Sequence, residues 1–296
     1  MSRLIANCLL FAAAFLWGLA FYFQKDAMAH IGPLTFVAAR SLIATAALLP
    51  LALREKPFPP GLIGQSVLAG GAFFLAAYLQ QSGLVTATVT NAGFLTAIYV
   101  VFTPLIAWAL LRQPPMAAIW PAVALSFLGT WTLGGGSVGG LTTGDILVGA
   151  SALFWALHVV LTSRASGLDR PFAFTCLQFA VVALVGTIGA AAFESPRVDD
   201  LAAAATSILY VGLVSSALTF TLLVVALRHT GAAEASVLLS MESVFAALAG
   251  AVLLHESLSP VSWAGAALIL AAIVIVQTGN FSRQPATPAS PASKSG

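Results

Sequence analysis

The chain has 296 residues, of which 59% are hydrophobic and only 7% are charged. A water-soluble globule of this size needs more polar surface, so the composition excludes a soluble domain and predicts a protein that lies in a lipid bilayer. The net charge of +2 and the scattered basic residues indicate no nucleic-acid partner. Cys8 and Cys176 both lie in apolar runs with no metal-binding spacing, so we expect neither a metal nor a cofactor.

Ten apolar stretches of spanning length follow one another along the chain. They cover residues 4–24, 32–53, 62–81, 90–111, 117–133, 146–163, 172–193, 201–227, 233–254 and 261–278. A hydrocarbon layer roughly 30 Å thick requires about 20 helical residues, and continuous apolar runs are typical of helices, whereas barrel strands alternate. The sequence therefore predicts an all-α integral membrane protein with ten transmembrane helices.

Lysine and arginine residues are distributed unequally between the two predicted faces of the membrane. Lys25 and Arg197 fall on one face, and Arg40 lies inside the second span. The opposite face has Arg3, Arg54, Lys56, Arg112, Arg164, Arg170, Arg228, Arg283 and Lys294. Because positive residues stay on the cytoplasmic side, we expect both termini in the cytoplasm of a bacterial-type inner membrane. Residues 281–296 are rich in Pro, Ser and Ala and are expected to form a disordered cytoplasmic tail.

The two halves of the chain align with each other. Trp17 matches Trp155 and Pro33 matches Pro171 at an offset of 138, and later residues such as Trp120 and Trp263 match at an offset of 143. We interpret residues 1–139 as one repeat of five helices and 140–280 as a second repeat. Since five is odd, the repeats would be inverted, a construction that is common in transporters with alternating access.

Three motifs carry a family resemblance. FLWGLAFYFQK in the first helix, Pro33 followed by Arg40 in the second, and SMESVFAALAGAVLLHESLSPVSWAGAALILAAIVIV in the last two resemble the EamA repeat of the drug/metabolite transporter superfamily. A typical Glu is matched by Glu256, whereas its counterpart in the first half is Gln113, and a frequent Pro is replaced by Ser243. The resemblance implies a central cavity between the repeats and export of amino acids or similar metabolites. Length and aromatic content are similar to those of YddG-type amino-acid exporters.

Aromatic and amide side chains within the spans are candidates for binding a substrate. Away from the membrane interfaces, aromatic rings suit an apolar or aromatic solute, and uncharged amides suit an amino-acid headgroup. These residues are Trp17, Tyr78, Phe94, Tyr99, Trp155, Gln81, Asn91 and Gln178. For each of them, ordinary helix packing is the alternative.

Charged side chains within the spans are the other candidates. Glu242 lies near the middle of its span, where a carboxylate is costly, and the repeat offset places Tyr99 opposite it. Glu242 is interpreted as a substrate or proton-coupling residue, or as a hydrogen bond between helices. His158 is a second coupling candidate, with packing as the alternative. Arg40 is interpreted mainly as a structural anchor and secondarily as a clamp for a substrate carboxylate.

Gly93 and Gly231 lie near the starts of two spans and are candidate hinges.

A membrane-embedded enzyme is the alternative function, but the chain has no GxSxG or HExxH motif and no pair of acids at catalytic spacing, so we expect no enzyme. A channel-like facilitator is a further alternative. We expect small molecules such as amino acids to be the substrates and the chain to be a monomer or a weak homodimer.

Overall fold

A computed structural model describes residues 1–112, 114, 115, 117, 119–133 and 142–278. In this part of the chain every regular element is a helix and no strand occurs. The helices are α1 (Arg3–Ala27), α2 (Pro33–Arg54), α3 (Leu62–Leu84), α4 (Val89–Ala97), α5 (Tyr99–Leu111), α6 (Ile119–Leu133), α7 (Thr143–Ser166), α8 (Pro171–Phe193), α9 (Val198–Ala203), α10 (Ala205–Leu209), the π-helix η1 (Tyr210–Leu218), α11 (Thr219–Leu227), α12 (Ala232–Leu239), α13 (Met241–Leu253) and α14 (Pro260–Thr278).

Eight helical segments of the described chain are long and apolar enough to cross a membrane. Three of them are composite: Val89–Leu111 joins α4 to α5, Ala205–Leu227 joins α10, η1 and α11, and Ala232–Leu253 joins α12 to α13. The apolar helices α6 and α14 are shorter. The predicted all-α membrane class is confirmed. The predicted repeat boundary at residues 139 and 140, Gln113 and the tail 281–296 lie outside the described residues.

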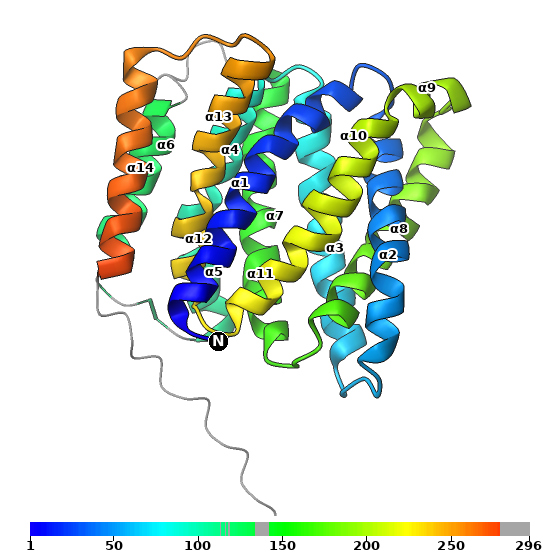
Figure 1. The fold of residues 1–296 in the computed structure, drawn as a ribbon, viewed down its shortest axis with the longest axis horizontal. Coiled ribbons are helices and arrows are strands. Elements are labelled where there is room, and N and C mark those ends of the chain that lie inside the picture. The colour runs from blue at the N-terminus through cyan, green and yellow to red at the C-terminus, as the bar shows by residue number, and fades with distance from the viewer. Residues whose placement is uncertain (113, 116, 118, 134–141, 279–296) are drawn as a thin grey trace, which may run out of the picture.

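The long helices stand side by side in one bundle (Figure 1). Helices α6 and α14 pack together at one edge, and α2 packs against α8 near the opposite side. Between them, α1 packs against α13 and α3 packs against α7. Small residues permit close crossings, because a Cβ atom on Gly83 would collide with the carbonyl oxygen of Gly144. Such backbone proximity stabilises helix pairs in lipid, where apolar burial provides little driving force.

Two glutamates join α2 and α8 reciprocally at opposite ends of the pair. Glu55, which follows α2, accepts a hydrogen bond from the backbone nitrogen of Ala173 at 2.7 Å, at the start of α8. Glu194, which follows α8, accepts bonds from the backbone nitrogens of Leu34 and Thr35 at 3.0 and 2.8 Å. Each carboxylate therefore caps the positive N-terminus of the partner helix.

Two of the membrane-crossing segments are interrupted near their middle. The first breaks at Ile98 between α4 and α5, shortly before Pro104, which cannot donate a backbone hydrogen bond to the preceding turn. The second breaks at Ser240 between α12 and α13. Here Ser240 donates to the carbonyl of Val237 at 2.6 Å and Ser243 donates to the carbonyl of Ser240 at 2.7 Å. Serine hydroxyls bonded to the preceding turn bend helices, which accounts for a break without proline.

Candidate functional site: a central cavity

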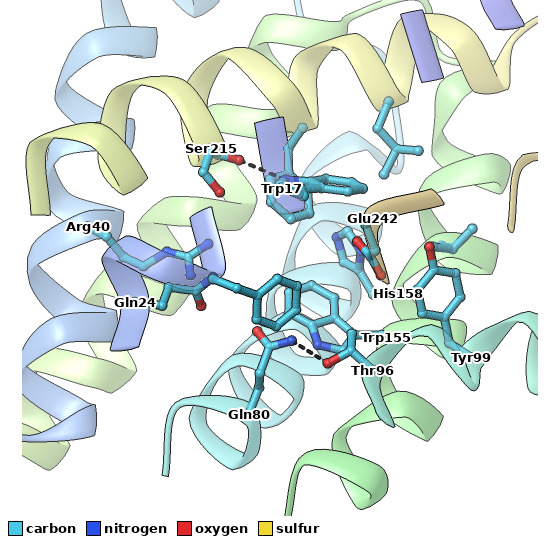
Figure 2. A pocket seen from close by; sticks show the side chains of 14 residues that line it. Trp17, Gln24, Arg40, Gln80, Thr96, Tyr99, Trp155, His158, Ser215 and Glu242 are labelled. Carbon is cyan, nitrogen blue, oxygen red and sulfur yellow. Dashed lines mark hydrogen bonds between the residues drawn. The ribbon is translucent and has the colours of Figure 1, made fainter. Parts of the chain in front are cut away.

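One cavity lies at the centre of the bundle and leaves about 40 Å³ in which the centre of a water molecule fits. It is enclosed by residues of both halves of the chain, namely Trp17, Phe21, Gln24, Arg40, Gln80, Thr96, Tyr99, Trp155, His158, Val159, Ser215, Phe220, Leu223 and Glu242. Arg40 and Gln24 lie at one side of it and Glu242 and Tyr99 at the other (Figure 2). Polar and charged groups therefore alternate with aromatic rings around one space.

The aromatic part of the wall is built around Phe220. Its ring lies 4.7 Å from the ring of Trp17 and stacks on Trp155 with the centroids 6.1 Å apart. Phe73 packs edge-on against the rings of Phe220 and Trp155 from behind, at 4.9 and 5.0 Å. Trp17 and Trp155, which the predicted internal repeat pairs, thus lie on two sides of one aromatic cluster.

The π-helix η1 supplies polar groups to the same wall. The indole nitrogen of Trp17 donates to the backbone carbonyl of Ser215 at 3.0 Å, as Figure 2 shows. The neighbouring hydroxyl of Ser216 accepts a hydrogen bond from Nε of Arg40 at 3.1 Å. A π-helix shifts the backbone bonds by one residue and often occurs at functional sites. Here it presents a carbonyl to Trp17 and a hydroxyl to Arg40.

Glu242 and Tyr99 lie at the two helix interruptions. Tyr99 is the first residue of α5 and Glu242 is the second of α13, and the two side chains are directed towards each other (Figure 2). Both are buried, Glu242 with 4% of its surface exposed. The hydroxyl of Tyr99 and the carboxyl of Glu242 interact with each other, but among the described residues neither the hydroxyl nor Oε1 of Glu242 forms a hydrogen bond of good geometry. These groups can therefore receive a hydrogen bond from water or from a solute.

Further polar atoms around the cavity are also unpaired within the described part of the chain. They include the indole nitrogen of Trp155, Nδ1 of His158 and Oε1 of Gln24. Buried polar groups normally have partners, and an orphaned group costs roughly 1–3 kcal/mol. Several orphans facing one small cavity indicate a site that water or a polar solute occupies.

The structure brings five of the predicted site residues together at the cavity. These are Trp17, Tyr99, Trp155, His158 and Glu242. Their common location follows from the packing of α1, α5, α7 and α13 around the centre of the bundle.

Five other predicted site residues do not line this cavity. Tyr78 stacks on Phe74, Phe94 packs against Trp131, and Gln81 donates to the carbonyl of Gln24 at 2.9 Å. Asn91 contacts Asp145 at 3.3 Å at the end of the bundle, and Gln178 contacts His158 at 2.8 Å behind the wall. Their observed contacts are those of helix packing, except that Gln178 supports the cavity residue His158.

Gln80, Thr96, Gln24 and Ser215 were missed by reasoning from the sequence. Gln80 donates to the hydroxyl of Thr96 at 2.8 Å (Figure 2), and both line the cavity. Phe73 and Gln80 are seven residues apart and share one face of α3, but no contrast between apolar and polar faces marks this face in the sequence. Gln81, one residue further on, lies on a different face.

The two candidate hinges occupy different settings. A Cβ atom on Gly93 would lie 2.5 Å from Cβ of Ala246, so this glycine permits close packing of α4 on α13. Gly231 is the N-cap of α12 and has an extended backbone, with φ −76° and ψ 155°. The interruptions themselves fall at Ile98 and Ser240. A hinge role for either glycine stays a prediction.

Polar contacts connect neighbouring helices at both ends of the bundle. At one end the guanidinium of Arg3 binds Glu234 of α12 at 2.7 Å. At the other, Glu256 accepts hydrogen bonds from the backbone nitrogens of Val89 and Thr90 at 2.9 and 3.0 Å, and so caps α4. These contacts join the ends of α1 and α4 to the α12–α13 segment, whose middle carries Glu242.

A multi-pass helical membrane protein with a polar cavity between its two halves has the architecture of a small-molecule transporter. The model of the EamA-like transporter family matches residues 4–135 and 142–278, and the chain belongs to this family.

Individual relatives agree with this assignment. The chain is 32% identical over 277 residues to an uncharacterized transporter of Archaeoglobus fulgidus, covering 93% of this chain and 87% of that protein. It is 26% identical to the uncharacterized transporter YwfM of Bacillus subtilis, over 93% and 95% of the two chains. A solved structure, titled only as the crystal structure of a protein, shares the fold with a TM-score of 0.74 and 17% identity, covering 93% of this chain and 96% of that one.

Proposed function

We propose that this chain is a secondary transporter that exports small metabolites, amino acids with apolar or aromatic side chains among them. The observation that carries the proposal is the central cavity, where aromatic rings alternate with unpaired polar atoms at mid-bundle. Aromatic faces bind an apolar side chain, and the unpaired donors and acceptors suit a zwitterionic headgroup.

The transport mechanism that we propose is alternating access between two inverted repeats of five helices. Two pairs of contacts support it. Helices α2 and α8 cap each other reciprocally through Glu55 and Glu194, and Tyr99 and Glu242 face each other at one side of the cavity. Such exchanged contacts are expected for two halves related by a twofold axis in the membrane plane. In this arrangement both termini face the cytoplasm.

Alternating access requires the helices around the cavity to move. In this structure about 40 Å³ of the cavity is open to the centre of a water molecule, which is room for a few waters. We expect the helices around the cavity to shift as a solute enters and leaves. The interruptions at Ile98 and Ser240 divide two of these helices into shorter segments, which can tilt independently.

Counterflow in proteoliposomes tests the proposed function. Vesicles that contain the purified protein are loaded with unlabelled leucine or phenylalanine, and the entry of labelled amino acid is followed. We expect exchange in protein-containing vesicles and none in protein-free vesicles. Trp155→Ala should reduce exchange strongly, whereas Trp108→Ala should not, because Trp108 is exposed and outside the cavity lining. Absence of exchange for a panel of apolar, aromatic and polar amino acids would overturn the proposal.

A further inference from the structure

The geometry points to Arg40 as the residue that binds the carboxylate of the transported solute. This inference rests on the proposed function and adds a specific recognition group to it. From the sequence, Arg40 was interpreted mainly as a structural anchor and secondarily as a clamp for a substrate carboxylate. The geometry favours the carboxylate clamp as the main role.

Arg40 is buried within the bundle. It lies about two turns from the N-terminus of α2, with 2% of its surface exposed, and it lines the central cavity. Its Nε atom donates to Ser216, and its guanidinium lies 5.4 Å from the ring centre of Phe73. These two contacts orient the plane of the guanidinium. No hydrogen bond from its two terminal nitrogens is seen within the described part of the chain.

The positive charge of Arg40 lacks a counter-ion. All ten acidic residues lie in the part of the chain that the structure describes, and none comes within ion-pair distance of Arg40. The ion pairs seen in that part involve other arginines, Arg3 and Arg228. Glu242 lines the same cavity but at its other side (Figure 2). An unpaired charge is costly in a membrane interior, so the site favours an incoming anion.

The free part of the guanidinium matches a carboxylate. Its planar array of N–H groups binds two carboxylate oxygens at once, and the hydrogen bonds are strengthened by charge. A purely structural arginine would direct these donors to backbone carbonyls or an acid. Trp17 and Trp155 lie further into the cavity, where they would contact the remainder of the solute. The site therefore selects a carboxylate joined to an apolar body.

Binding of leucine and of its amide, leucinamide, tests this assignment. The amide keeps the side chain and the amino group but has no carboxylate. Binding is measured by calorimetry on the full-length protein in detergent micelles. We expect the wild type to bind leucine roughly 10- to 100-fold more tightly than leucinamide, the range typical of hydrogen bonds to a charged group. Arg197→Gln, at an arginine outside the cavity lining, serves as the matched control and should keep this ratio.

Arg40→Gln should weaken leucine binding to the level of leucinamide and leave leucinamide binding unchanged. A structural anchor would instead weaken both ligands equally, and that result would overturn the assignment. If Arg40→Gln does not fold, Arg40→Lys provides the measurement. Lysine keeps the charge but cannot form two parallel bonds, so the ratio should fall several-fold. An unchanged ratio in Arg40→Lys would also refute the assignment.

The outcomes separate this inference from the proposed function. A wild-type protein that binds and exchanges leucine and leucinamide equally well would remain a transporter, but Arg40 would not recognise the carboxylate. A wild-type protein that binds neither ligand and exchanges no amino acid would refute the proposed substrate class and the assignment of Arg40 together.

Discussion

Replacing Glu194 by Gln tests how strongly the reciprocal contacts hold α2 against α8. The carboxylate of Glu194 accepts three hydrogen bonds, from the backbone nitrogens of Leu34 and Thr35 and from the hydroxyl of Thr35 at 2.6 Å. An amide has one acceptor oxygen, and its NH₂ group would face a backbone donor. The variant therefore loses the negative charge at the helix N-terminus and at least one charge-assisted bond.

The magnitude follows from these two losses. A charge near a helix N-terminus is worth about 0.3–1 kcal/mol, and one hydrogen bond to a charged group about 1.5 kcal/mol where water competes. Glu194 is partly exposed, so the lower ends of these ranges apply. We expect Glu194→Gln to lower the free energy of unfolding by about 2 kcal/mol. Glu55→Gln should cost about half as much, because one of its two bonds, to Phe172, is long at 3.3 Å.

Reversible unfolding in mixed detergent micelles, followed by circular dichroism, measures both variants. Asp199→Asn is the matched control, because it removes one exposed negative charge at the start of a short surface helix. It should change the free energy of unfolding by a few tenths of a kcal/mol. If Glu194→Gln costs no more than this control, the carboxylate does not stabilise α2, and the reciprocal capping contributes no measurable stability.

Three other results are expected. A single cysteine introduced at Ser293 should react with a membrane-impermeant reagent only from the cytoplasmic side, and labelling from outside would contradict the predicted orientation. Tyr99→Phe should alter the relative exchange rates of amino acids, whereas Tyr78→Phe should not, because the ring of Tyr78 stacks outside the cavity; equal effects would contradict the cavity assignment. Glu242→Gln should remove any response of transport to a pH gradient while sparing exchange at equal pH, and a retained response would exclude Glu242 from coupling.

The helical class and the approximate positions of the helices could be predicted from the sequence, because lipid imposes length and hydrophobicity on every span. Aromatic residues placed near the middle of their spans, such as Trp17 and Trp155, were also found, since position along a span is readable from the run that contains it. The helix face on which a residue lies, and so whether it points into the cavity, could not be predicted from the sequence in this way. Gln80 and Gln81 are equally polar and adjacent, yet only Gln80 lines the cavity.

The cavity-facing side of a helix could not be predicted because apolar residues are distributed almost evenly around these helices. Apolar residues are spread evenly around helix α3, so the usual contrast between a buried stripe and a polar face is missing. Orientation is then determined by close contacts with neighbours, such as that of Gly83 with Gly144, which depend on the whole assembly. The π-helix is a similar case, since nothing in the sequence of Tyr210–Leu218 distinguishes it from an ordinary span.

The irregular backbone segments and the cavity share one location for a physical reason. A regular helix in lipid satisfies its own backbone groups and offers none to a solute. The breaks at Ile98 and Ser240 and the π-helix depart from that pattern at mid-bundle, where one side of each segment packs against protein. There they carry Tyr99, Glu242 and the Ser215 carbonyl to the cavity. Regularising any one of these segments would therefore stabilise the helix while removing polar groups from the site.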